Sequence, residues 1–260
     1  MELGLTGKVA LVTGSSRGIG RGIAEMLAQE GCDLVLAGTS EQALQEAAAA
    51  VGAHGHRVET LALDLRQEEA PAALATVVRR GWGRLDILVN NAGTTKRGDF
   101  LKLTDADWAD GYALKFFAHV RLARAAWPML KESGGSLVAI GGSSGRVPAA
   151  SFTIGSSVNS AVAAFTKALA ALGKNDGVQV NCIHPSYVDT ERFARRVRAD
   201  MERTGQSETA VRDWHRKDIG ITRIGTVADV AALVAFIVSA RGRWLHGATI
   251  ELDGGEVRAL

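Results

Sequence analysis

A glycine-rich turn near the amino terminus constrains the fold more than any other feature of the sequence. The apolar run at residues 9–12 leads directly into the segment TGSSRGIG at residues 13–20, and an amphipathic stretch with helical spacing follows at residues 19–29. Glycine permits a tight turn and lets a phosphate approach the first turn of the following helix. This succession indicates the start of a βαβ unit that binds a nucleotide.

Short aliphatic runs alternate with longer alanine-rich segments along the whole chain. The longer segments have helical spacing, for example at residues 43–51 and 152–172. This alternation predicts a parallel sheet covered on both faces, so we expect an α/β, doubly wound fold of Rossmann type. No linker interrupts it, and residues 1–260 are expected to form a single nucleotide-binding domain. The predicted strands lie at residues 9–12, 34–36, 58–63, 87–89, 137–140, 178–183 and 249–252.

Residues 191–220 are a polar and charged interruption of this rhythm, placed after the sixth predicted strand where a lid would sit. Two interpretations are open. The segment is a pair of solvated helices, which we favour, or an arginine clamp for an acidic substrate. Its arginines include Arg192, Arg195, Arg196, Arg198, Arg212 and Arg216.

The overall charge excludes several classes of partner. The chain has 30 Lys and Arg against 28 Asp and Glu, a net charge of +2, so no strong field would draw it to nucleic acid or to an anionic membrane.

The apolar run at residues 230–238 is too short to span a bilayer, and the amino terminus lacks secretory features. Cys32 and Cys182 show no metal-ligand spacing. We therefore expect a cytoplasmic protein without a bound metal.

The glycine-rich turn, together with Asn90-Asn91-Ala92-Gly93 after the fourth predicted strand, resembles the short-chain dehydrogenase/reductase family. Further similarities bring the resemblance to residues 5–255. It implies an NAD(P)-dependent oxidoreductase for a small-molecule substrate that the sequence does not identify. Asp64 alone would also suit a helix N-cap. The predicted cofactor-binding residues are Gly14, Ser16, Arg17, Gly18, Ile19, Gly20, Thr39, Ser40, Asp64, Leu65, Asn90, Ala92, Gly93, Lys115, Pro185, Val188 and Thr190.

The residues after the second predicted strand favour NADP over NAD. An acid at this position would hydrogen-bond the ribose 2′-hydroxyl and repel a 2′-phosphate. The chain instead has Gly38-Thr39-Ser40 there, and Arg17 lies in the neighbouring turn. Two hydroxyls and a guanidinium can donate to a phosphate, although Arg17 would also suit the surface.

The family's catalytic residues do not appear at the matching positions. Its members use a tyrosine as general acid and base and a lysine four residues later that lowers the tyrosine's pKa. Counting back from Thr166-Lys167 places Gly155 at the tyrosine position and Asn159 at the lysine position. A glycine has no proton to give, and an asparagine carries no charge.

The family's other two roles, a serine and an asparagine that orient the substrate and the relay, also fall on different residue types. Gly142 takes the serine position, although a shift of one residue would place Ser143 there. Lys115 takes the asparagine position, counted from Trp108. Lysine and asparagine have therefore exchanged places. The Lys115 ammonium would reach the cofactor ribose while Asn159 takes the orienting role, or it would point to solvent or to a neighbouring carboxylate.

Two functional hypotheses follow. The first is an oxidoreductase with another proton relay, drawing on Lys115, Ser143, Asn159 or Tyr187, with His184 as a further acid/base candidate. The second is a catalytically silent nucleotide-binding protein that acts as a sensor or partner subunit. The resemblance also implies a homodimer or homotetramer that pairs through helices at residues 105–131 and 152–172.

Overall fold

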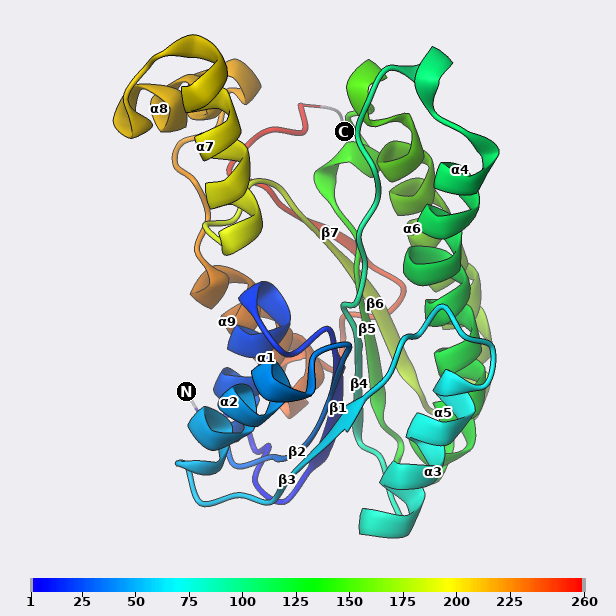
Figure 1. The fold of residues 1–260 in the computed structure, drawn as a ribbon. Coiled ribbons are helices and arrows are strands. Elements are labelled where there is room, and N and C mark those ends of the chain that lie inside the picture. The colour runs from blue at the N-terminus through cyan, green and yellow to red at the C-terminus, as the bar shows by residue number, and fades with distance from the viewer. Residues whose placement is uncertain (1, 259–260) are drawn as a thin grey trace.

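The computed structural model describes residues 2–258, which form one α/β domain around a seven-stranded parallel sheet (Figure 1). The strand order is β3-β2-β1-β4-β5-β6-β7, so the expected doubly wound fold is confirmed. Each predicted strand is present, with ends that differ by at most two residues. The bounds are β1 Val9–Thr13, β2 Asp33–Gly38, β3 Val58–Ala62, β4 Ile87–Asn90, β5 Ser136–Ile140, β6 Gln179–Pro185 and β7 Thr249–Leu252.

Helices cover both faces of the sheet (Figure 1). One layer buries Ile23, Leu44 and Val234 against the sheet, and the other buries Leu74, Leu122 and Val158. The first layer contains α1 Gly18–Gln29, α2 Glu41–Gly52 and α9 Val227–Val238, and the second contains α3 Ala70–Trp82, α4 Asp105–Tyr112, α5 Ala118–Ser133 and α6 Thr153–Asp176. Within residues 2–258, no helix combines the length and the apolar character needed to cross a membrane.

The polar segment at residues 191–220 forms two helices, α7 Glu191–Thr204 and α8 Glu208–Ile219. They pack on each other through Phe193, Val197 and Val211, a small apolar cluster separate from the two large ones. In Figure 1 the pair stands apart from α4 and α6, above the carboxyl ends of the strands.

The long helix expected at residues 105–131 is divided. A π-helical turn, Ala113–Phe117, joins α4 to α5, and Lys115 lies within it. A π turn inserts an extra residue into a helix and is frequent at functional sites, because it shifts the direction of the side chains around it. Sequence periodicity did not reveal this interruption.

The carboxyl ends of β1 and β4 are held together at the point where the strand order reverses. The Thr13 hydroxyl accepts hydrogen bonds from the N–H groups of Asn91 and Ala92, each at 3.0 Å. The Asn91 side-chain amide donates to the Thr13 carbonyl at 2.9 Å. Ligands of doubly wound proteins bind in the crevice at this reversal, so these contacts set the base of the candidate site.

A buried carboxylate, Asp86, holds the opposite ends of the same strands. It is 3% exposed, accepts a hydrogen bond from the Val9 N–H at 3.0 Å, and pairs with Arg84 at 2.6 Å and Lys8 at 3.3 Å. Burial alone would raise the pKa of Asp86. The hydrogen bonds from Arg84 and Val9 and the charge of Lys8 outweigh it, so the pKa lies below its ordinary value.

We expect Asp86→Asn to lower the free energy of unfolding at pH 7 by about 1.5–3 kcal/mol, because it removes charge-assisted hydrogen bonds to a buried group. Because the folded pKa is depressed, this stabilisation is complete above the unfolded pKa and is lost as the pH falls through the folded one. Urea titrations from pH 7 to pH 3 should therefore show the two proteins converging. Asp213→Asn, at an exposed ion pair, is the control and should change stability by less than about 0.5 kcal/mol.

Candidate functional site

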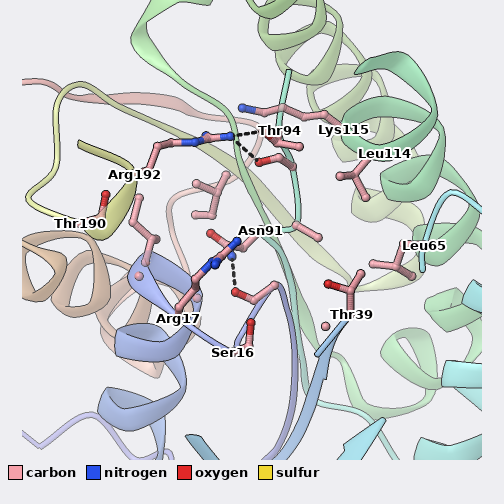
Figure 2. Close-up of a pocket in the computed structure, with 18 of the residues that line it drawn as sticks. Ser16, Arg17, Thr39, Leu65, Asn91, Thr94, Leu114, Lys115, Thr190 and Arg192 are labelled. Carbon is pink, nitrogen blue, oxygen red and sulfur yellow. Dashed lines mark hydrogen bonds between the residues drawn. The ribbon is translucent and has the colours of Figure 1, made fainter. Parts of the chain in front are cut away.

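A cavity of about 370 Å³ opens at the carboxyl ends of the central strands, beside the reversal of strand order (Figure 2). It is bounded by the glycine-rich turn, the ends of β2, β4 and β5, the π turn and the start of α7. Twelve of the residues predicted to bind the cofactor line it: Gly14, Ser16, Arg17, Gly18, Ile19, Gly20, Thr39, Leu65, Ala92, Gly93, Lys115 and Thr190.

The glycine-rich turn is shaped to receive phosphate. Gly14 and Gly18 have φ angles of 65° and 56°, which favour glycine. A Cβ at Gly20 would lie 2.3 Å from the Gly14 carbonyl oxygen, so only glycine lets the turn close on α1. In the described chain, the N-cap Arg17 makes no side-chain capping bond and the first turn of α1 has no acid. Its N–H groups remain for an anion, and these residues fit a dinucleotide pyrophosphate.

The adenosine end of the cavity contains the residues that bear on cofactor choice. Thr39 lines it next to Gly38, and Arg17 lies across from them (Figure 2). Ser40 does not line the cavity, because its hydroxyl caps α2 by accepting from the Ala43 N–H at 3.3 Å. Arg17 lies 3.8 Å from Glu191, a long contact between exposed groups.

Four other predicted cofactor residues do not line the cavity. The Asn90 amide donates to the His119 carbonyl at 3.2 Å, which ties β4 to α5. Asp64 accepts a hydrogen bond from the Arg66 N–H at 3.0 Å, so its side chain closes a turn. It does not cap a helix, which the alternative interpretation had suggested. Pro185 ends β6, and Val188 lines a second pocket.

Several cavity residues were not predicted. Asn91 lies within a recognised motif, but its side-chain role at the Thr13 carbonyl depends on the pairing of two strands distant in sequence. Arg192 and Arg195 lie one helical turn apart in the segment for which the sequence left open a solvated helix pair, which we favoured, and an arginine clamp. The residues lining the cavity outside the predicted set are Gly38, Leu63, Arg66, Asn91, Thr94, Leu114, Ile140, Gly141, Glu191, Arg192 and Arg195.

Lys115 extends from the π turn into the cavity, and its ammonium donates to the Gly141 carbonyl at 3.2 Å. Gly93 makes room for it, since a Cβ there would lie 2.8 Å from Lys115 Cγ. Burial, followed by the charge of Arg192, lowers the pKa of Lys115 to about 8. The ammonium therefore points neither to solvent nor to a carboxylate among the described residues.

The glycines at positions 142 and 155 leave volumes that other side chains occupy. A Cβ at Gly142 would lie 2.9 Å from the Asn159 side-chain nitrogen, which donates to Ser144 Oγ at 2.9 Å. A Cβ at Gly155 would lie 2.1 Å from the ring of Phe152. Asn159 and Phe152 thus take the place of side chains at these two positions.

The remaining acid/base candidates are placed away from the cavity. Ser143 is 9% exposed and lies in a short turn, in which its own carbonyl accepts hydrogen bonds from the Arg146 and Val147 N–H groups. Tyr187 lines the second pocket, and burial raises its pKa. His184 is fully buried, and burial lowers its pKa to about 4, so its imidazole is neutral near pH 7.

A doubly wound parallel sheet with a phosphate-binding turn at its reversal point defines a dinucleotide-binding protein of Rossmann type. The short chain dehydrogenase family model matches residues 8–201, and the chain belongs to this family. It is 35% identical over 253 residues to an uncharacterized oxidoreductase of Mycobacterium tuberculosis, covering 96% of this chain and 92% of the relative. It is 30% identical to the 3-oxoacyl-[acyl-carrier-protein] reductase FabG of Vibrio cholerae, covering 97% and 98%.

Solved structures of similar proteins have the same fold. The L-sorbose reductase of Gluconobacter frateurii, complexed with NADPH and L-sorbose, superposes with a TM-score of 0.96 at 31% identity over the whole of both chains. A short chain dehydrogenase of Burkholderia cenocepacia in complex with NADP gives a TM-score of 0.85 at 34% identity, covering 97% and 98% of the two chains.

We expect Gly155→Tyr alone not to raise ketone reduction, because Asn159 carries no charge that would lower the new phenol's pKa. We expect it to destabilise the protein by about 1–3 kcal/mol, because the new side chain competes with the Phe152 ring. Adding Phe152→Ala should remove most of this extra cost, so that the two changes are strongly non-additive in urea unfolding. Gly52→Tyr is the control, because a Cβ there meets nothing within 4 Å in the described chain. Additive effects at Gly155 and Phe152 would contradict the packing argument.

Proposed function

We propose that the protein is an NADP(H)-dependent oxidoreductase that interconverts a small-molecule carbonyl and its alcohol, with Lys115 in place of the family's tyrosine as proton donor. One observation carries the proposal: the Lys115 ammonium lies in the cavity, at the Gly141 carbonyl. Gly155 removes the phenol and Asn159 removes the lysine at the two positions matched to the family's relay. The site nevertheless keeps one mobile proton and one positive charge.

The cofactor would be held by the glycine-rich turn at its pyrophosphate and by Thr39 and Arg17 at its 2′-phosphate. The bound dinucleotide supplies the hydride. The relatives crystallised with NADPH or NADP support this choice, as does the absence of an acid at Gly38.

We expect the native protein to bind NADPH more tightly than NADH and Gly38→Asp to reverse that order. A Cβ at Gly38 would lie 3.4 Å from Ser16 Oγ, so the carboxylate would stand at the adenosine end of the cavity. It would repel a 2′-phosphate and accept from a ribose hydroxyl. Fluorescence titration with both dinucleotides measures this, and Gly38→Asn controls for size without charge. Tighter native binding of NADH would contradict the cofactor assignment.

Lys115 has the properties of a general acid. With its pKa lowered to about 8, its ammonium gives up a proton more readily than an ordinary lysine near neutral pH. The proton would pass from Nζ to the substrate oxygen as the carbonyl carbon is reduced, and the neutral amine would then take a proton from water. The Gly141 carbonyl holds Nζ in place before substrate arrives.

We expect Lys115→Met to lower kcat for carbonyl reduction by about 10²–10⁴-fold, the usual contribution of a positioned general acid. The donor is the ammonium, so native turnover should fall as the pH rises through about 8, and the residual activity of the variant should lack this step. Lys115→Arg keeps the charge without a removable proton and should also be inactive.

The control is Lys167→Met, which removes a lysine that donates to the Gly247 carbonyl at 2.8 Å, away from the cavity. It should leave turnover unchanged. Assays would follow NADPH oxidation over a panel of ketones, aldehydes, enones and sugars, L-sorbose included. Full activity of Lys115→Met would overturn its role as proton donor.

A second candidate function is favoured by the Phe152 ring, which occupies the space that a side chain at position 155 would need. In that case the protein binds the dinucleotide but reduces nothing, and serves as a sensor or partner subunit. Tight NADPH binding without turnover over the whole panel would support this alternative.

A further inference from the structure

We propose that Arg97, Arg192 and Arg196 form a binding site for an anionic group of the substrate, a carboxylate or a phosphate, beside the Lys115 ammonium. The inference deepens the proposed reaction by naming its substrate class and rests on that function for turnover. Binding of the anion itself can be tested without turnover.

The three arginines come from two segments that face each other. Arg192 and Arg196 lie four residues apart on α7, on one face of the helix, and Arg97 lies in the segment that follows β4. The Arg192 guanidinium crosses to that segment and donates to Thr94 Oγ1 and, at 3.4 Å, to the Gly93 carbonyl. Figure 2 shows this contact, with Lys115 beside it.

None of the three arginines has a carboxylate partner within ion-pair distance among residues 2–258. Of the other arginines of α7 and α8, all but Arg198 have such a partner among the described residues. Arg203 pairs with Asp200, Arg212 with Asp189 and Glu208, and Arg216 with Asp213. The unpaired side chains of Arg192 and Arg196 thus share one face of α7, opposite Arg97.

Two of these guanidinium groups are held by aromatic rings. Arg97 Cζ lies 3.8 Å from the centroid of the Phe152 ring, and Arg196 Cζ lies 4.9 Å from that of Tyr187. A guanidinium stacked through its face keeps its N–H edge for a carboxylate or phosphate. Phe152 therefore fills the volume left by Gly155 and also supports a cation.

Positive charges gathered around Arg97 and Arg192 make the cluster receptive to an anion. Burial, Arg196 and Arg192 lower the pKa of Arg97, while burial and then Arg195 and Arg17 lower that of Arg192. Two acids, Glu256 and Asp218, add to the effect of burial in raising the pKa of Tyr187. Neither forms an ion pair with the three arginines in the described chain. A bound anion would offset charge that no described side chain neutralises.

The cluster extends beyond the region assigned to the cofactor phosphates. Arg17 and Arg195 line the nucleotide cavity and contact Glu191 at 3.8 Å and 3.2 Å. Arg97 and Arg196 do not line that cavity. Arg192 lines it, and its charge contributes to lowering the pKa of both Lys115 and Arg97. The anion site thus adjoins the reacting carbonyl, so the substrate class is a short oxo acid or oxo phosphate.

Calorimetry with NADP-saturated protein tests the binding step. The probes are levulinate, dihydroxyacetone phosphate, and methyl levulinate as the neutral counterpart of the acid. We expect at least one anion to bind and the ester to bind at least about tenfold more weakly, because the ester lacks the charge-assisted hydrogen bonds that the acid accepts from the arginines. Comparing the two anions distinguishes a carboxylate site from a phosphate site.

Arg97→Met and Arg196→Met should each weaken anion binding at least tenfold while NADPH affinity stays within about twofold. Arg198→Met is the control, because Arg198 lies two residues beyond Arg196, about 200° around the helix. Equal binding of ester and acid, no anion binding, or equal loss in all three variants would overturn the inference. Anion binding without turnover of the carbonyl panel would instead overturn the proposed reaction and leave the anion site standing.

Discussion

The contact between the ends of β1 and β4 is the interaction on which the rest of this structure depends. One hydroxyl, on Thr13, accepts two backbone hydrogen bonds from the segment that follows β4. The amide of Asn91 returns a hydrogen bond to β1. Because the strand order reverses here, the loops above β1 and β4 diverge, and the space between them becomes the cavity. Gly20 then closes the turn so that α1 points its free N–H groups into that space.

Glycines shape the chemistry of the site because they leave room for the side chains of neighbouring residues. Gly93 lets the Lys115 stem pass, Gly142 leaves room for the Asn159 amide, and Gly155 accommodates the Phe152 ring. Protein interiors are close-packed, so a volume vacated at one position is taken by a neighbour. These glycines are therefore coupled through packing to the side chains beside them. A larger residue at any one of them would meet the neighbour that occupies the space.

The charge of the site follows from the same arrangement. Lys115 brings one positive charge from the π turn, and α7 brings arginines from the opposite side (Figure 2). Burial lowers the pKa values of both Lys115 and Arg192, and the charge of Arg192 adds to the effect on Lys115. Such a site is suited to the phosphates of a dinucleotide and, as we propose, to an acidic substrate beside them.

The sequence by itself determined the sheet, the covering helices and the phosphate-binding turn, because these depend on local periodicity and on glycine at defined positions. It also singled out Lys115 and Asn159, by counting from the flanking residues Trp108 and Thr166-Lys167. Only the tertiary structure decided that Lys115 turns into the cavity while Tyr187 packs against α7 and α8. The same holds for Arg97 stacking on the Phe152 ring and for Phe152 entering the volume beside Gly155. These contacts join segments far apart in sequence, and which side chain fills a vacated volume depends on neighbours that no local pattern specifies.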